Sequence, residues 1–274
     1  MRNCVREFRV YSQWGEDGII EWLLSQVDVP NHRFVEFGVE TFREANCRFL
    51  LRHRNWKGLV IDGSERNIAS LREEPLYWMH DLTAKAAFVT AENIDSLIVE
   101  AGFAGPIGLL SIDIDGNDYW VWKAIEAVDP AIVVCEFNAV FGDNQALTVP
   151  YDAAFVRLKA HHSGLYFGAS IAAFHQLADA KGYVFVGTNS AGNNAFFVKR
   201  ERAGSVLANL TAARAVPSRF RESRDSWGTL SFVSGTDRLD VIGDLPVINL
   251  ATGKTQPLRD VKGLYSEEWL SGMC

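Results

Sequence analysis

The chain has 274 residues, of which 48% are hydrophobic and 22% charged, so it can bury a substantial core without disulfide or metal staples. A formal net charge of −7 argues against a nucleic-acid-binding protein, which needs a basic face. The four cysteines form no CxxC pair, the first residues lack an apolar signal core, and no apolar run reaches the roughly 18 residues of a membrane span. We therefore expect a cytoplasmic protein without a membrane span.

Short apolar runs alternate with helix-length segments through the first half of the chain. The expected strands are 33–39, 57–63, 76–81, 107–115 and 131–138, and the expected helices between them are 44–54, 64–74, 90–102 and 118–128. The runs are continuous in hydrophobicity, which is typical of strands covered on both faces. This order predicts a parallel sheet with right-handed crossovers.

The pattern changes after residue 138. A long connection, 139–170, precedes a predicted helix over 171–182. Two strands over 183–188 and 194–200 then form a predicted hairpin, and another hairpin is expected around Thr252-Gly253.

We expect an α/β fold over residues 1–200, with a Rossmann-like, seven-stranded, mostly parallel sheet that ends in an antiparallel hairpin. Residues 201–274 are expected to form a C-terminal extension, whose role the sequence does not indicate.

Acidic residues recur where the predicted strands end. They are Glu36, Asp62, Asp81, Asp113, Asp115 and Glu136. Ligands of open parallel sheets bind beyond the carboxyl ends of the strands. The repetition over five strands therefore predicts a binding site at this edge of the sheet.

Several short motifs together resemble a known family. They are SQWGED (12–17), VEFG (35–38), IDGS (61–64), HDL (80–82), SIDIDG (111–116) and VVCEFN (133–138). In this order, they resemble the class I S-adenosylmethionine-dependent methyltransferases, and most of all the FkbM-like branch. Many members of that branch are thought to methylate hydroxyls of sugars and natural products. The likeness covers about residues 10–200.

The resemblance implies a set of cofactor contacts in this chain: Gln13, Glu36, Gly38, Asp62, Gly63, Ser64 and Asp81. Asp62 would accept hydrogen bonds from the two ribose hydroxyls, and Asp81 would lie near the adenine. Glu36 would favour the cationic sulfonium, and Gln13 would belong to a segment folded over the cofactor. The chain departs from the usual glycine-rich first motif, because only Gly38 remains.

The stretch SIDIDGND admits several interpretations. Strand periodicity would place Asp113 and Asp115 on one face, so that two carboxylates converge. The spacing excludes an EF-hand loop, and the mid-chain position argues against a haloacid dehalogenase-type phosphatase. A metal-dependent glycosyltransferase, with Asp113 and Asp115 as its DxD motif, remains an alternative that leaves VEFG and IDGS unexplained.

The same stretch also resembles the strand-four end of cation-dependent O-methyltransferases. That resemblance implies Asp113, Asp115, Glu136 and Asn138 as ligands of Mg²⁺ or another divalent cation, which would compensate the converging charges. Binding of cofactor and acceptor without a metal is the alternative. Asp115 could instead contact the acceptor.

His161 and His162 lie in the long connection, and either could be the general base. The predicted function is methyl transfer from S-adenosylmethionine to a hydroxyl of a small-molecule or glycan acceptor. A SAM-binding protein that has lost catalysis is a further alternative. The sequence leaves the oligomeric state open, a homo-oligomer included.

Overall fold

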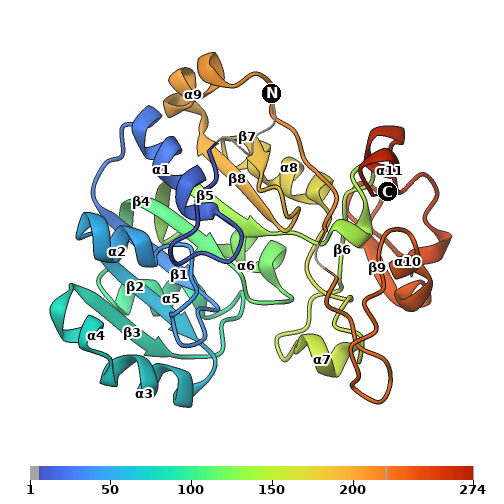
Figure 1. The fold of residues 1–274 in the computed structure, drawn as a ribbon, viewed down its shortest axis with the longest axis horizontal. Coiled ribbons are helices and arrows are strands. Elements are labelled where there is room, and N and C mark those ends of the chain that lie inside the picture. Colours follow the sequence, from blue (N-terminus) through green and yellow to red (C-terminus); the bar gives the residue numbers. More distant parts are fainter. Residues whose placement is uncertain (1–5, 220, 274) are drawn as a thin grey trace.

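A seven-stranded sheet forms the centre of the computed structural model, which describes residues 6–219 and 221–273 (Figure 1). Its strands are β1 (Arg33–Phe37), β2 (Lys57–Asp62), β3 (Leu82–Ala86), β4 (Gly105–Ile112), β5 (Val128–Glu136), β7 (Tyr183–Thr188) and β8 (Asn194–Lys199). The order across the sheet is β3-β2-β1-β4-β5-β8-β7. Only β8 runs against its neighbours. The predicted α/β fold with a mostly parallel sheet and a final antiparallel hairpin is confirmed.

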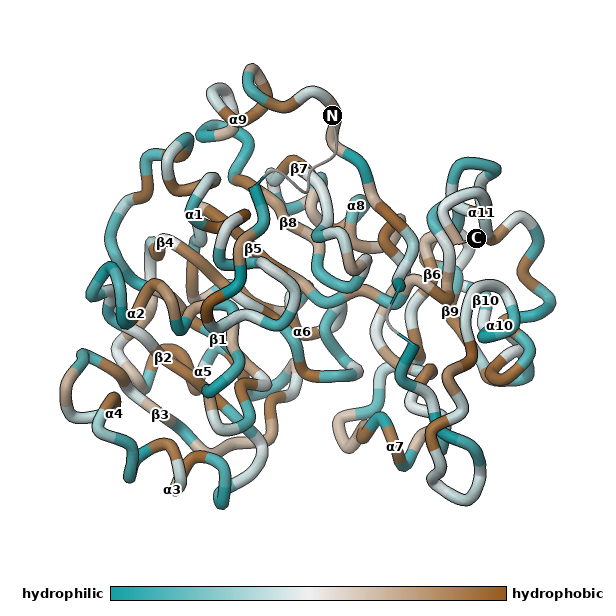
Figure 2. Tube along the Cα trace, in the orientation of Figure 1, coloured by the Kyte–Doolittle hydropathy of each residue, from teal (hydrophilic) through white to brown (hydrophobic). Residues whose placement is uncertain are grey.

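Helices cover both faces of this sheet. One face carries α5 (Ile94–Glu100), α6 (Asp118–Ala124) and α8 (Ile171–Ala180). The other carries α1 (Glu16–Gln26), α2 (Arg48–Arg54), α3 (Glu65–Glu73), α4 (Pro75–Met79) and α9 (Gly204–Asn209). Hydrophobic residues are concentrated along central strands such as β2, β4 and β5 (Figure 2), because these strands are buried from both sides.

The third strand is the main correction to the sequence prediction. Residues 76–81 were expected to be a strand, but α4 covers most of this stretch and β3 follows it. Pro75 occupies the start of α4, where its fixed φ and missing N–H favour a helix. The apolar residues that suggested a strand include Trp78, which is 76% exposed. β3 is an edge strand with alternating burial, so it lacks a continuous apolar run.

A second, smaller lobe combines the long connection with the C-terminal residues. Its antiparallel sheet has the order β10-β9-β6, with strands β6 (Leu147–Thr148), β9 (Pro246–Asn249) and β10 (Lys254–Pro257). It also contains α7 (Arg157–Ala160), α10 (Asp237–Ile242) and α11 (Glu267–Met273). Phe141 and Tyr166 share one core with Ile242, Val247 and Leu258. The predicted division at residue 200 therefore does not follow the packing, since residues on both sides of it build this lobe.

The hairpin expected around Thr252-Gly253 is confirmed as β9 and β10.

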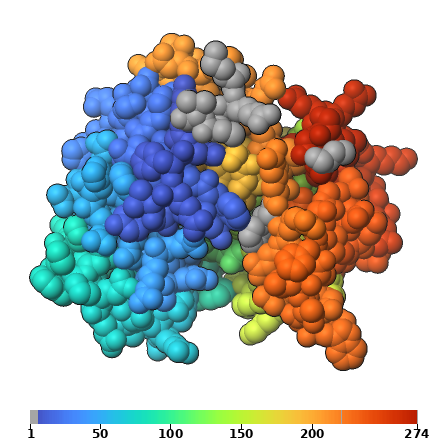
Figure 3. All heavy atoms as spheres, viewed as in Figure 1, coloured from blue at the N-terminus to red at the C-terminus, as the bar shows by residue number. Residues whose placement is uncertain are grey.

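In the view of Figure 3, the residues near the N-terminus, in blue, and the C-terminal lobe, in orange and red, lie on opposite sides of the molecule. Within the described residues, no helix combines the length and the apolar character that a membrane crossing requires.

Candidate active site

A cavity of about 650 Å³ opens at the carboxyl edge of the parallel strands. Its polar lining comes from seven separate stretches of the chain: Gln13, Glu36, Glu40, Glu44, Asn46, Asp113, Asp115, Glu136, Arg157, Ser163, Asn194, Glu222 and Arg224. A smaller cleft of about 170 Å³ adjoins it and is lined by Asp62, Gly63 and Phe88. Both are lined by Gly38 and Asp113, so they form two parts of one site.

Gln13 reaches the cavity from a segment held by Asp17. The Oδ2 atom of Asp17 accepts hydrogen bonds from the backbone N–H groups of Val10, Tyr11 and Ser12, at 2.7 to 3.0 Å. The hydroxyl of Ser12 accepts in return from Asp17 N. Most of SQWGED is thus a structural anchor, while Gln13 is exposed at the cavity wall.

Glu36 presents a buried carboxylate to the cavity from β1 and is 4% exposed. Asn46 N donates to its Oε1 at 2.8 Å, and Cys47 N donates to its Oε2 at 3.1 Å. Burial raises the pKa of Glu36 to about 7, although the hydrogen bonds from Cys47 and Asn46 oppose the rise. Its charge can therefore change near neutral pH.

Gly38 allows β1 and β4 to approach each other closely where the site begins. Its φ is +70°, and a Cβ atom there would lie 1.6 Å from the carbonyl oxygen of Asp113. No other residue type fits this position without moving the loop after β4. The glycine retained from the predicted first motif is explained by this contact.

Asp62 ends β2 at the smaller cleft and is 7% exposed. Its Oδ2 accepts from Glu40 N at 2.7 Å, and its Oδ1 accepts from Ser64 N at 2.8 Å and from Asn67 Nδ2 at 3.2 Å. A carboxylate has about four acceptor positions, so the capacity for about one further hydrogen bond remains. The hydroxyl of Ser64 caps α3 by accepting from Asn67 N, whereas Gly63 is exposed at the cleft.

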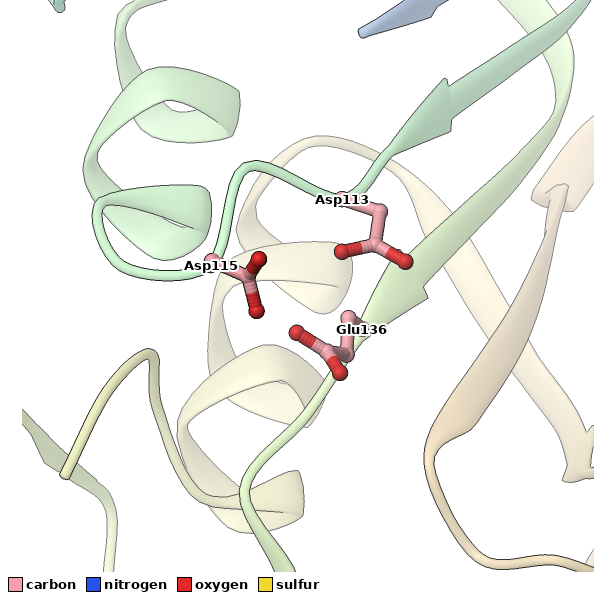
Figure 4. A group of neighbouring side chains, drawn as sticks. All are labelled: Asp113, Asp115 and Glu136. Atoms are coloured by element: carbon pink, nitrogen blue, oxygen red, sulfur yellow. The ribbon is translucent and has the colours of Figure 1, made fainter. Parts of the chain in front are cut away.

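Asp113, Asp115 and Glu136 point toward one another beyond the ends of β4 and β5 (Figure 4). One carboxylate oxygen from each lies within 4.8 Å of the others. The predicted convergence of the Asp113 and Asp115 carboxylates is confirmed, but it does not arise from the alternation of side chains along a strand. β4 ends at Ile112, so both aspartates lie in the following loop, where Asp115 has a left-handed φ of 55°.

Asp118 shapes this loop from inside the protein and is fully buried. Its carboxylate accepts from Ile114 N at 2.8 Å and from Gly116 N at 2.9 Å. These bonds fix the backbone that carries Asp113 and Asp115. Burial raises the pKa of Asp118 to about 6, against the effect of those backbone hydrogen bonds.

The electrostatics of the cluster favour a bound positive charge. Burial raises the pKa values of Asp113 and Glu136 well above their ordinary range, and the charges of the neighbouring carboxylates raise them further. The Oε2 atom of Glu136 is buried and has no hydrogen-bond partner among the described residues. Ionising both carboxyls is therefore unfavourable, and positive charge placed beside them favours their ionised forms.

Arg157, at the start of α7, supplies a positive charge that the sequence analysis did not identify. Its Nη1 donates to Asp115 Oδ1, and its Nε donates to the carbonyl of Gly164 at 2.6 Å. Its guanidinium carbon lies 3.8 Å from the centre of the Phe167 ring. No motif marks Arg157 in the sequence; only its place in the long connection hinted at a functional segment.

Two predicted site residues lie elsewhere. Asn138 follows β5 but is 2% exposed; its side chain accepts from Val140 N and donates to the carbonyls of Leu165 and Phe167. It therefore holds the long connection in place and does not line the cavity. Asp81 precedes β3 rather than ending a strand, so it lies at the amino edge of the sheet, 3.3 Å from Lys57 Nζ.

The two candidate histidines are adjacent to the cavity but are not among the residues that line it. Their ring centres are 4.2 Å apart, and His161 Nδ1 lies 2.8 Å from Ser163 Oγ. Burial and the neighbouring His162 lower the pKa of His161. Ser163 and Gly164, which follow them, do line the cavity.

Comparison with known proteins gives distant structural likenesses only. No family model matches the chain, and no curated protein matches it. The chain is similar to a SAM-dependent methyltransferase from Clostridium acetobutylicum, with 11% identity, a TM-score of 0.43, and coverage of 69% of this chain and 92% of that one.

Two further solved structures are similar at the same level. The N-terminal domain of EvdMO1 with SAH bound has 9% identity, a TM-score of 0.42, and coverage of 67% and 79% of the two chains. The CcbJ methyltransferase from Streptomyces caelestis has 13% identity, a TM-score of 0.41, and coverage of 69% of this chain and 90% of that one. Similarity this distant does not assign an activity to this chain.

Proposed function

We propose that this protein transfers a methyl group from S-adenosylmethionine to a hydroxyl oxygen of a small-molecule or glycan acceptor. The observation that carries the proposal is a two-part site at the carboxyl edge of β1, β2, β4 and β5. The parts meet at Gly38 and Asp113, between β1 and β4, where the strand order reverses. Nucleotide ligands of open parallel sheets bind at such reversal points.

The two parts suit the two halves of the reaction. The cleft beside Asp62 would hold the nucleoside, with Glu40 as a second carboxylate within its lining. Glu36, in the wall of the larger cavity, would favour the cationic sulfonium when ionised. The acceptor would then lie near Asp113, Asp115 and Glu136, with its oxygen aligned with the methyl group. The resemblance of the sequence motifs to the FkbM-like branch implies the same roles for Asp62 and Glu36.

The residues of the cluster fit a divalent cation. Three carboxylates can each offer an oxygen within 4.8 Å of the others, and oxygen ligands are those that Mg²⁺ prefers. The unpartnered Oε2 of Glu136 is a further reason to expect a cation there. We infer that Asp113, Asp115 and Glu136 hold the ion, without Asn138. Such an ion would lower the pKa of the acceptor hydroxyl.

Isothermal titration of S-adenosylmethionine and its demethylated product tests the cofactor half. Asp62→Ala should weaken binding by about 1–3 kcal/mol, since ligand and backbone groups lose a charged acceptor. Asp81→Ala should leave the affinity unchanged, because Asp81 lies at the opposite edge of the sheet. Thermal unfolding must show that both variants fold, and Asp62→Asn should bind with intermediate affinity.

The same titration separates the alternatives. Wild-type protein that binds a nucleotide-sugar and not S-adenosylmethionine would support the glycosyltransferase and reject the methyltransferase. Binding of S-adenosylmethionine without turnover on any hydroxylated acceptor would support a catalytically inactive binding protein. Equal losses in Asp62→Ala and Asp81→Ala would show that the cofactor does not bind in the Asp62 cleft.

A further inference from the structure

Arg157 is held against the carboxylate cluster by three separate contacts. It pairs with Asp115, its Nε donates to Gly164 O at 2.6 Å, and its guanidinium stacks over Phe167. Its side chain is only 22% exposed. A guanidinium stays charged at any ordinary pH, so Arg157 brings a permanent positive charge to the cluster.

The guanidinium occupies the place that a bound cation would need. It engages Asp115 Oδ1, one of the ligand oxygens available to an ion, and it places a positive charge beside the other two carboxylates. A divalent cation in the cluster would repel this charge at short range. The ion and the guanidinium are attracted by the same carboxylate charges and repel each other, so binding of one weakens binding of the other.

The surroundings of Arg157 allow it to leave. α7 is a single short turn, and none of its residues is buried. Leu158 beside Arg157 is 59% exposed, so moving this turn sacrifices little apolar contact. By contrast, Glu136 is the last residue of β5, and Asp113 directly follows β4 in the loop that Asp118 holds. Displacing Arg157 therefore sacrifices less packing than displacing Asp113 or Glu136 would.

We propose that Arg157 is a built-in competitor for the cation site: it compensates the carboxylates in the ion-free protein and withdraws from Asp115 when a divalent cation binds. This rests on the proposed cation site but not on methyl transfer itself. Its consequence is that the affinity for the ion is set below what three carboxylates alone would give. Because Arg157 and Leu158 line the cavity, ion binding also reshapes the acceptor side of the site.

Manganese binding measured by electron paramagnetic resonance of the free ion, on metal-stripped full-length protein, tests the proposal. Arg157→Gln should bind Mn²⁺ on the order of tenfold more tightly than wild type, because a competing charge is removed. Arg224→Gln is the matched control. It removes the cavity's other arginine, which bonds to Gly228 O and Glu222, so it should change the affinity by less than about twofold.

A second variant confirms where the ion binds: Asp115→Asn in the Arg157→Gln background should lose the gain. Unchanged or weaker Mn²⁺ binding in Arg157→Gln would overturn the proposal, because Arg157 would then be neutral or supportive toward the ion. An equal gain in Arg224→Gln would also overturn it, since only overall charge would matter. No Mn²⁺ binding in any variant would reject both the cation site and the competition. Titration of S-adenosylmethionine on the same samples reports on the methyltransferase proposal independently.

Discussion

Replacing Glu36 with Gln should change how the stability of the protein depends on pH. Burial raises the pKa of this carboxyl from an ordinary value of 4.5 to about 7 in the folded protein. Between these two values the folded chain binds more protons than the unfolded chain, so stability falls as the pH rises through this window. The substitution removes the titration while keeping the shape of the side chain and one acceptor for Asn46 N or Cys47 N.

The magnitude follows from the width of the window. From about pH 5.5 to pH 7 the unfolded chain has already lost this proton and the folded chain keeps it, at about 1.4 kcal/mol per pH unit. Ionisation of Glu36 therefore costs the wild type about 2 kcal/mol of unfolding free energy between about pH 5.5 and pH 8. The difference in stability between Glu36→Gln and wild type should shift by this amount, in favour of the variant at high pH.

Urea unfolding of both proteins at about pH 5.5 and pH 8 measures this double difference. Other buried acids of the site, such as Asp118, contribute equally to both proteins and cancel. Glu44→Gln is the control, because it removes an exposed carboxylate from the same cavity. A difference between Glu36→Gln and wild type that stays constant with pH would refute the reasoning, as would the same shift in Glu44→Gln.

Gly38→Ala should lower the unfolding free energy by more than Gly102→Ala, as judged by urea unfolding. Both glycines have a positive φ, which costs an alanine about 1–2 kcal/mol. At Gly38 the added Cβ would also meet Asp113 O, whereas at Gly102 it would meet nothing within 4 Å. Equal losses of unfolding free energy in the two variants would contradict the close approach at Gly38. Exhaustive chelation of metal ions should abolish turnover, and added Mg²⁺ or Mn²⁺ should restore it. Binding of S-adenosylmethionine, measured by calorimetry, should survive chelation. Full turnover by the metal-stripped enzyme would reject the proposed role of the cation. His161→Ala and His162→Ala should each retain most of the kcat, because neither ring lines the cavity; a large loss of kcat in either, with KM unchanged, would restore that histidine as the general base.

Much of the site could be predicted because strand order and strand ends follow from local patterns. Continuous apolar runs placed β1, β2, β4 and β5 correctly, and parallel strands bring their carboxyl ends to one edge. Glu36, Asp62 and Glu136 therefore came together as expected. The prediction for Asp81 was wrong because an edge strand carries a weak apolar signal, and aromatic residues on an exposed helical turn imitated a strand.

The sequence by itself determined most of the strands and most of the acids at their carboxyl ends, since a strand and the acid that follows it are marked by residues close together in the chain. Only the tertiary structure decided what surrounds those acids. It brought Arg157 to Asp115, 42 positions earlier in the chain. It directed the Asn138 side chain away from the cavity, where the amide donates to the carbonyls of Leu165 and Phe167. It also joined the long connection to the C-terminal residues in one hydrophobic core. Each of these contacts joins segments that are distant in the chain, and local hydrophobic periodicity does not encode such contacts. They depend on how the two lobes pack against each other and on which partner each buried polar group finds.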